Sequence, residues 1–166
     1  ERGQRLGKDA GPGVFRSDVM RQREDVEARG EKLFSARLQR FGGIRSEVLY
    51  PPPPERPYRT DAYRDYVFAV SRLTALKRLG LLVEAAALMK AKGLRVVIAG
   101  QGEEEGPLRE RVAALGLEGR VELVGAVSEA ELLDHYARCR AVFFAPWNED
   151  YGFVTLEAFR SGKAVV

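Results

Sequence analysis

The sequence predicts an α/β protein built on a Rossmann-like, doubly wound parallel sheet that starts near Tyr66. Two observations carry this prediction. Short apolar runs rich in β-branched residues alternate with longer runs whose apolar residues recur at helical spacing. The longer runs also begin and end at residues that favour helix termini. Strands that alternate with helices in this way form parallel sheets through right-handed crossovers.

The elements follow one another in a regular order. We expect strands at residues 66–71, 94–99, 120–124, 141–145 and 163–166, and helices at 79–92, 107–115, 128–139 and 154–160. In the first helix, the residues expected to face the core are Leu81, Leu82, Ala85, Ala86, Leu88 and Met89. Pro107 is expected at the first position of its helix, where its missing N–H costs nothing. Ser128 and Glu131 have the spacing of a capping box, and Cys139 is expected to be a small buried residue.

The first third of the chain has a different composition. Residues 1–50 are rich in charge and glycine and hold the basic excess of a chain whose net charge is +3. They include an amphipathic stretch at 32–41 and a short expected strand at 47–50. Four consecutive prolines from Pro51 must be extended, so we assign residues 51–65 to a stiff interdomain linker. We expect residues 1–50 to be a loosely held, protease-sensitive remnant of another domain, and 66–166 to be the folded domain.

Composition excludes several classes of protein and site. No apolar run approaches the roughly 20 residues of a membrane span, and no signal peptide is evident, so we expect a cytoplasmic setting. The N-terminal Arg residues alternate with Asp and Glu, which favours a solvated helix face over an anionic partner, and no nucleic-acid partner is expected. The single His135 and single Cys139 form no metal-ligand pattern, so no metal site is predicted.

The loop after the first strand carries unusual charge for a helix entry. Arg72 and Lys77 lie where a helix is about to begin, although cations are unfavourable at a helix N-terminus. Ligands of doubly wound sheets bind beyond the carboxyl ends of the strands. These two cations therefore suggest a clamp for a diphosphate, with ordinary helix-entry charge as the alternative.

The loop after the fourth strand places two carboxylates around a glycine. Glu149 precedes Gly152, and Glu157 follows it about one turn into the expected helix. Carboxylates accept hydrogen bonds from vicinal hydroxyls such as those of ribose and hexose. The N–H groups of Phe153 and Val154 would be available to an anion. The alternative is a solvated acidic loop with a glutamate that favours the helix N-terminus.

A glycine-rich loop after the second strand is not a dinucleotide fingerprint. Gly100, Gly102 and Gly106 nearly reproduce that spacing, but three consecutive glutamates at 103–105 would repel a pyrophosphate. Either a glycine-lined turn that a ligand approaches or a plain turn fits better.

Together these residues resemble glycosyltransferase family 4. The residues that carry the resemblance are Val70 to Leu73, Lys77, Ile98 to Gly102, Arg120, Val121, Gly125, and above all Glu149 to Glu157 followed by Ala158 and Gly162. The resemblance implies one half of a two-domain glycosyltransferase-B fold. It implies hexosyl transfer from a nucleotide-diphosphate sugar to a hydroxyl acceptor, with retention of configuration and no metal or cofactor.

The resemblance also implies residue roles. Arg72, Lys77 and Glu149 would be catalytic, and the donor would be bound by Gly152, Phe153, Val154, Glu157, Gly100, Gly102 and Val127. The acceptor would be a sugar, a lipid-linked or a small hydroxyl compound. Peripheral membrane contact would come through an acceptor domain of which residues 1–50 are at most a remnant, so we expect this fragment alone to be inactive. A non-catalytic nucleotide-binding or regulatory module of the same fold is the alternative.

Overall fold

The computed structural model describes residues 35–47, 52–91, 93–147, 149 and 151–166. The chain divides into two compact units, Glu1–Tyr50 and Pro51–Val166. In the first unit residues 35–42 are helical, in agreement with the described part of the amphipathic stretch expected at 32–41. The prediction that residues 1–50 are loosely held, and the expected strand at 47–50, fall mainly outside the described residues.

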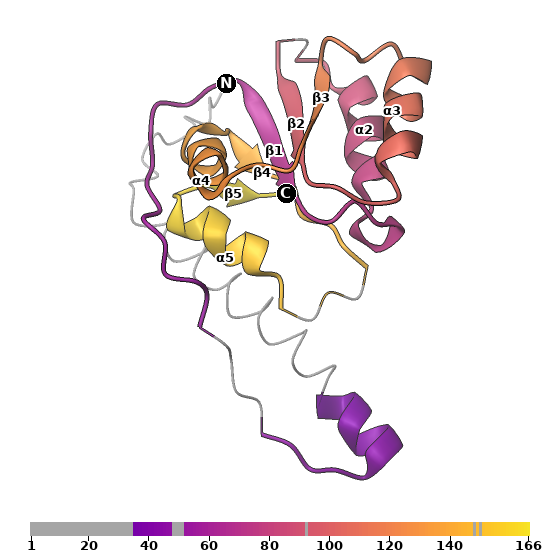
Figure 1. The fold of residues 1–166 in the computed structure, drawn as a ribbon, viewed down its shortest axis with the longest axis vertical. Helices are drawn as coiled ribbons and strands as arrows, with labels where there is room; N and C mark the ends of the chain where they lie inside the picture. Colours follow the sequence, from indigo (N-terminus) through magenta and orange to yellow (C-terminus); the bar gives the residue numbers. More distant parts are fainter. Residues whose placement is uncertain (1–34, 48–51, 92, 148, 150) are drawn as a thin grey trace, which may run out of the picture. The chain divides into compact units, whose positions relative to one another are not determined.

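The second unit is a parallel five-stranded sheet covered by helices, as the sequence predicts. The strands are β1 (Tyr66–Val70), β2 (Arg95–Ala99), β3 (Val121–Gly125), β4 (Ala141–Val142) and β5 (Ala164–Val165). The helices are the short η1 (Ala75–Lys77), α2 (Leu79–Leu88), α3 (Glu105–Ala114), α4 (Glu129–Arg138) and α5 (Phe153–Arg160). The strand order is β3-β2-β1-β4-β5, and every pair is parallel (Figure 1).

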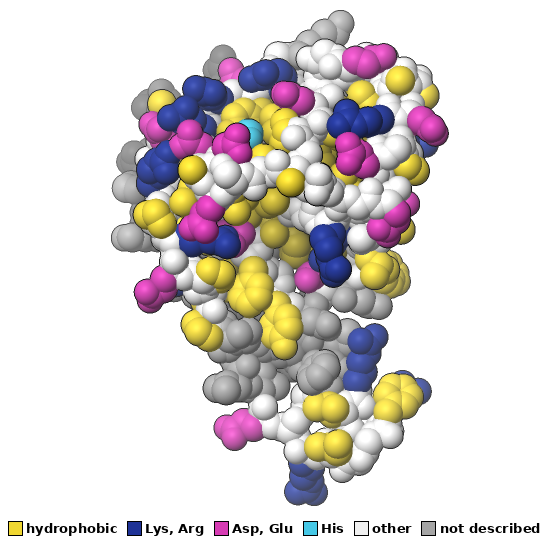
Figure 2. Space-filling model, viewed as in Figure 1, with side chains coloured by type: hydrophobic (Ala, Val, Ile, Leu, Met, Phe, Trp, Pro, Cys, Tyr) yellow, Lys and Arg dark blue, Asp and Glu magenta, His cyan; other side chains and the backbone are white. Residues whose placement is uncertain are grey.

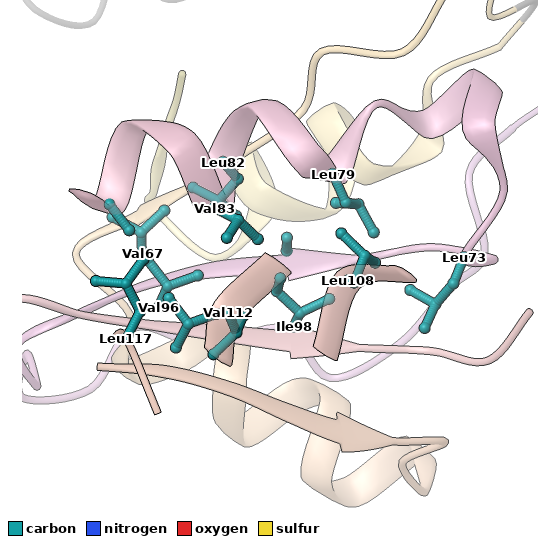
Figure 3. Packing of buried hydrophobic residues seen from close by; sticks show 13 residues of the cluster. Val67, Leu73, Leu79, Leu82, Val83, Val96, Ile98, Leu108, Val112 and Leu117 are labelled. Atoms are coloured by element: carbon teal, nitrogen blue, oxygen red, sulfur yellow. The ribbon is translucent and has the colours of Figure 1, made fainter. Parts of the chain in front are cut away.

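The helices form two layers, one on each face of the sheet. In Figure 1, α2 and α3 lie on one side, and α4 and α5 on the other. The first layer packs on a cluster that includes Val67, Leu82, Val83, Ile98 and Leu108 (Figure 3). The second layer packs on a cluster that includes Phe68, Val97, Tyr136, Val142 and Ala158. The central strands of the sheet are therefore buried on both faces, which explains why their sequences are continuous apolar runs.

Two helices differ from the prediction. α2 ends at Leu88 and buries Leu79, Leu82, Val83 and Ala86, whereas Leu81 is 40% and Leu88 is 83% exposed. The predicted inner face was therefore wrong for these two leucines and for Ala85, which is also exposed. α3 begins at Glu105, so Pro107 is its third residue rather than its first. The helix tolerates proline there because the N–H groups of a first turn have no partner within the helix.

Several other details match the prediction. The hydroxyl of Ser128 accepts a hydrogen bond from the backbone N–H of Glu131, and the Glu131 carboxylate accepts one from the Ser128 backbone, which completes the capping box. Cys139 is fully buried, and burial raises the pKa of its thiol to about 11. One detail differs: strands β4 and β5 have two residues each and are shorter than the strands expected at 141–145 and 163–166.

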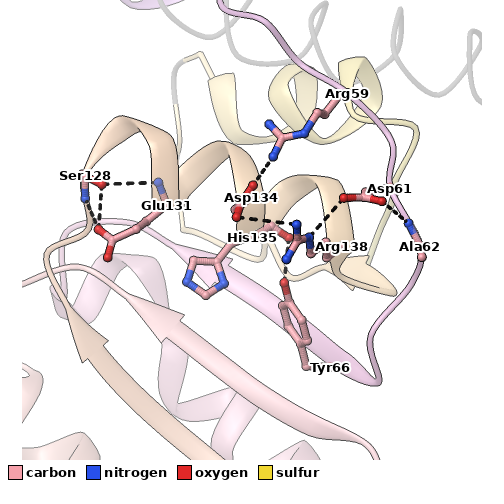
Figure 4. Close-up of polar contacts among 9 residues, drawn as sticks. All are labelled: Arg59, Asp61, Ala62, Tyr66, Ser128, Glu131, Asp134, His135 and Arg138. Atoms are coloured by element: carbon pink, nitrogen blue, oxygen red, sulfur yellow. Dashed lines mark hydrogen bonds and ion pairs between the residues drawn. The ribbon is translucent and has the colours of Figure 1, made fainter.

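The segment before β1 is attached to the second helix layer. The backbone N–H groups of Asp61 and Arg64 donate to the carbonyls of Ala137 and Arg138 at 2.9 and 2.7 Å. The Arg138 guanidinium reaches the Asp61 carboxylate at 3.2 Å (Figure 4). Residues 59–65 of the expected linker thus pack within the compact unit. A role of residues 51–65 in joining two domains stays a prediction.

Candidate donor site at the end of the sheet

The strand order reverses between β1 and β4, and this point is a candidate ligand site. Strands β1 and β4 are neighbours, yet the loop after β1 leads to α2 on one face and the loop after β4 leads to α5 on the other. The two loops therefore separate at the carboxyl ends of the strands. Open α/β sheets bind their ligands at such a point, because nothing of the chain crosses over it.

An ion pair joins the two loops there. The Lys77 ammonium, at the end of η1, contacts the Glu149 carboxylate, which follows β4 by seven positions. Their side chains are 21% and 28% exposed. The backbone N–H of Trp147 also donates to the carbonyl of Leu76 at 2.8 Å. Two of the three side chains predicted to be catalytic thus meet across 72 positions of sequence.

The structure adds two residues that sequence analysis did not single out for this site. The Arg78 guanidinium lies 5.8 Å from the centre of the exposed Trp147 ring, which joins the same two loops by a cation–π contact. Arg78 has a φ of 54°, in the left-handed region that non-glycine residues rarely adopt. Such strain is typical of functional loops. The sequence signal was the third cation of this loop and a tryptophan two residues before Glu149.

The third predicted catalytic residue is close in sequence but not part of this pair. The side chain of Arg72 is exposed, and within the described part of the chain it makes no hydrogen bond or ion pair. Its carbonyl accepts from the Ser71 hydroxyl at 3.0 Å and from the backbone N–H of Thr74 at 3.0 Å. These bonds fix the loop backbone from which the exposed Arg72 side chain extends.

The start of α5 presents backbone donors to the same region. Gly152 is the N-cap with a φ of 61°, and no side chain caps the helix. The hydroxyl and backbone N–H of Thr155 both bond to the carbonyl of Gly152, at 2.6 and 2.9 Å. The N–H groups of Phe153 and Val154 belong to the first turn of the helix, which leaves them without carbonyl partners inside it. The helix dipole adds partial positive charge there.

The glycines after β2 have a packing reason. A Cβ on Gly100 would lie 1.8 Å from the carbonyl oxygen of Ser71, and one on Gly102 would lie 2.3 Å from that of Leu73. The backbone N–H of Leu73 donates to the carbonyl of Gln101 at 2.9 Å. The loops after β1 and β2 are therefore in backbone contact. Of the two alternatives considered from the sequence, these distances favour a plain turn packed against the protein over a turn that a ligand approaches.

Val127 lies at the edge of the second core cluster. It is half-buried in the loop between β3 and α4, where it packs against the cluster that contains Tyr136 and Ala158. Its position follows the carboxyl end of β3, on the same edge of the sheet as the other loops.

Glu157 is placed differently from Glu149. It lies in the second turn of α5, is 8% exposed and is held by three side chains of the protein. The Tyr136 hydroxyl donates to Oε2 at 2.7 Å, and Arg56 and the Tyr58 hydroxyl donate to Oε1 at 2.8 and 3.2 Å. Sequence analysis missed these partners, because Arg56 and Tyr58 lie about a hundred positions away.

His135 belongs to the packing of the opposite end of the sheet. Its ring stacks on Phe68 with 4.8 Å between ring centres, and burial lowers the pKa of the imidazole. His135, Tyr66 and Asp134 are among the residues that line a cavity of about 290 Å³. Hydrophobic and charged side chains surround His135 on the surface (Figure 2). Within the described ranges, no three His, Cys, Asp or Glu side chains gather in a way that could hold a metal ion, and no helix is long and apolar enough to cross a membrane.

The chain matches one family model and several known proteins. The model of the family described as "Glycosyl transferases group 1" matches residues 56–166, which is more than half of the chain. The GtfA subunit of a UDP-N-acetylglucosamine–peptide N-acetylglucosaminyltransferase from Streptococcus gordonii is 29% identical over 126 residues, 75% of this chain and 23% of that protein. A D-inositol 3-phosphate glycosyltransferase from Kineococcus radiotolerans is 35% identical over 108 residues, 58% of this chain and 25% of that protein.

A solved structure shows the same fold. The pneumococcal O-GlcNAc transferase GtfA, in complex with UDP and GlcNAc, matches with a TM-score of 0.68 and 22% identity over 83% of this chain and 28% of that one. The chain thus spans about a quarter of the length of the relatives it matches.

Proposed function

Because this chain belongs to the glycosyl transferases group 1 family, we propose that it supplies the nucleotide-sugar side of a family 4 glycosyltransferase. The whole enzyme would transfer a hexosyl group from a nucleotide-diphosphate sugar to a hydroxyl acceptor, with retention of configuration. A relative whose name includes UDP-N-acetylglucosamine makes a uridine nucleotide the first donor to test. In this proposal the donor is a substrate, and neither a metal nor a cofactor takes part.

The observation that carries the proposal is the contact between Lys77 and Glu149 at the switch point of the sheet. Both side chains of this pair keep some exposure, 21% and 28%, so an anion can reach the Lys77 ammonium. A diphosphate carries more negative charge than one carboxylate, so Lys77 can exchange Glu149 for it. Glu149 would then be free to accept hydrogen bonds from hydroxyls of the sugar.

The other residues have roles that fit the chemistry of a leaving nucleoside diphosphate. Negative charge grows on the diphosphate as the glycosidic bond breaks, and the cations Arg72 and Lys77 would stabilise it. The first N–H groups of α5, at Phe153 and Val154, would bind a phosphate or sugar oxygen. Glu157 would accept from the ribose.

The remaining predicted donor-binding residues lie in the loops after β2 and β3. In the proposal, Gly100, Gly102 and Val127 border the nucleoside. For both glycines, the contacts with Ser71 and Leu73 support a shaping role through the loop backbone more than direct approach of the ligand.

Binding of charged and uncharged ligands tests the proposal. We expect Lys77→Ala to weaken UDP binding about tenfold, the loss of roughly one charge-assisted hydrogen bond, and to leave uridine binding unchanged. The control is Lys90→Ala, an exposed lysine beyond the other end of α2. Calorimetry with both ligands on the full chain is the measurement. Equal losses for UDP and uridine would refute the diphosphate contact.

A further inference from the structure

The carboxylate of Glu157 is almost fully used by the protein. Oε1 accepts from Arg56 at 2.8 Å and from the Tyr58 hydroxyl at 3.2 Å, while Oε2 accepts from the Tyr136 hydroxyl at 2.7 Å. A carboxylate offers about four acceptor positions, two on each oxygen. Three are occupied, and the fourth lies on Oε2, the oxygen bound by Tyr136.

Tyr136 is built into the core around this bond. Its side chain is fully buried, and its ring meets those of Phe68 and Tyr58 edge to face, with 5.4 and 6.5 Å between ring centres. Burial and the neighbouring carboxylate raise the pKa of Tyr136, so its hydroxyl stays protonated and donates. The ring cannot move without disturbing the core, and its hydroxyl therefore fixes Oε2 in one place.

Arg56 completes the fixation from the outside. Its guanidinium side chain is 25% exposed and also lies 3.7 Å from Glu129, at the start of α4. It ties Oε1 to the segment that leads into β1. Without such partners a carboxylate as buried as Glu157 would be strongly unfavourable, because burial removes its hydration.

We propose that Tyr136 and Arg56 are positioning residues for donor recognition: they hold the Glu157 carboxylate so that one acceptor position, on Oε2, receives a single ribose hydroxyl. This inference rests on the proposed function of Glu157. A positioning role differs from a purely structural role in its effect on ligand binding. A structural residue stabilises the fold whichever ligand binds, whereas a positioning residue changes the affinity only of ligands that carry the ribose hydroxyl.

A cycle of two ligands and matched variants separates these roles. The probes are UDP and 2′,3′-dideoxy-UDP, which lacks both ribose hydroxyls, with calorimetry on the full chain. We expect the wild type to prefer UDP about tenfold, the value of one hydrogen bond to a charged group. Tyr136→Phe removes only the hydroxyl and should reduce this preference below about threefold. Dideoxy-UDP binding should not change.

Tyr66→Phe is the matched control. Tyr66 is 5% exposed, and its hydroxyl donates to the carbonyl of His135 at 3.1 Å, away from Glu157. The control should keep the tenfold preference. Arg56→Gln, at the exposed edge of the cluster, should also reduce the preference for UDP. It is the variant to use if Tyr136→Phe does not fold.

The outcomes distinguish the inference from the function on which it rests. If the wild type binds neither nucleotide, the proposed function fails and the inference with it. If the wild type prefers UDP, and both variants keep that preference or weaken the two nucleotides equally, Tyr136 and Arg56 are structural. In that case the positioning role is overturned while the donor site stands.

Discussion

Replacing Gly100 by alanine tests whether the glycine loop after β2 serves packing or ligand approach. The new Cβ would lie 1.8 Å from the carbonyl oxygen of Ser71, and the residue has a φ of 136°, which side chains rarely adopt. The loop cannot simply move away, because the Gly100 N–H donates to the carbonyl of Gly125 at 2.7 Å. Backbone strain costs about 1–3 kcal/mol and overpacking about 1–3 kcal/mol. We therefore expect a loss of roughly 2–6 kcal/mol of unfolding free energy.

The assay is thermal unfolding followed by circular dichroism. In a domain of this size each kcal/mol shifts Tm by roughly 4 °C, so Gly100→Ala should lower Tm by at least about 8 °C. The control is Gly80→Ala, within α2, where a Cβ would meet nothing within 4 Å. It should leave Tm unchanged or raise it by a few degrees, because alanine favours helix over glycine. A Gly100→Ala protein with the wild-type Tm and no UDP binding would refute the packing explanation.

Three further changes probe other parts of the domain. Under the proposed function, Glu149→Gln should abolish sugar transfer by the whole enzyme, while Tm falls by no more than about 4 °C, or roughly 1 kcal/mol, because the glutamine oxygen can still accept a hydrogen bond from Lys77; a large loss of Tm with activity retained would contradict the assignment. Ser128→Ala should cost about 1 kcal/mol in urea unfolding. The pKa of Glu131 is lowered in the fold, so its ionised form stabilises the helix above its ordinary pKa and this contribution fades as the pH falls through the folded value; the cost of Ser128→Ala should be smaller at pH 3 than at pH 7. Cys139 should resist thiol reagents in the native protein and react at once in urea, and fast native labelling would argue against its burial.

Local and periodic features of the fold could be predicted from the sequence. The capping box depends on two residues three positions apart, and the alternation of strands and helices depends on repeating patterns. The inner face of α2 could not be predicted, because leucine, valine and alanine surround nearly the whole helix and periodicity then gives no direction. Its outer leucines, Leu81 and Leu88, show that hydrophobic character alone does not determine burial.

The candidate site divides in the same way. Lys77 and Glu149 could be predicted to belong to one site, because parallel strands bring their carboxyl ends to one edge of the sheet. Unusual charged residues in the loops after the first and fourth strands pointed to that edge. The partners of Glu157 could not, since Arg56, Tyr58 and Tyr136 come from two distant segments that meet only after the segment before β1 packs on the helices. No pattern in the sequence encodes that path.

The unequal lengths of the strand ladders divide the domain into a strong and a weak half. β1 pairs with β2 over five positions but with β4 over only two, and β4 pairs with β5 over two. Amide protons of β4 and β5 should therefore exchange with solvent through local opening that leaves β1 and β2 intact. Lys77 belongs to the strong half and Glu149 to the weak one. A ligand that bridges their loops would suppress this opening, so slower exchange in β4 would report occupancy of the site.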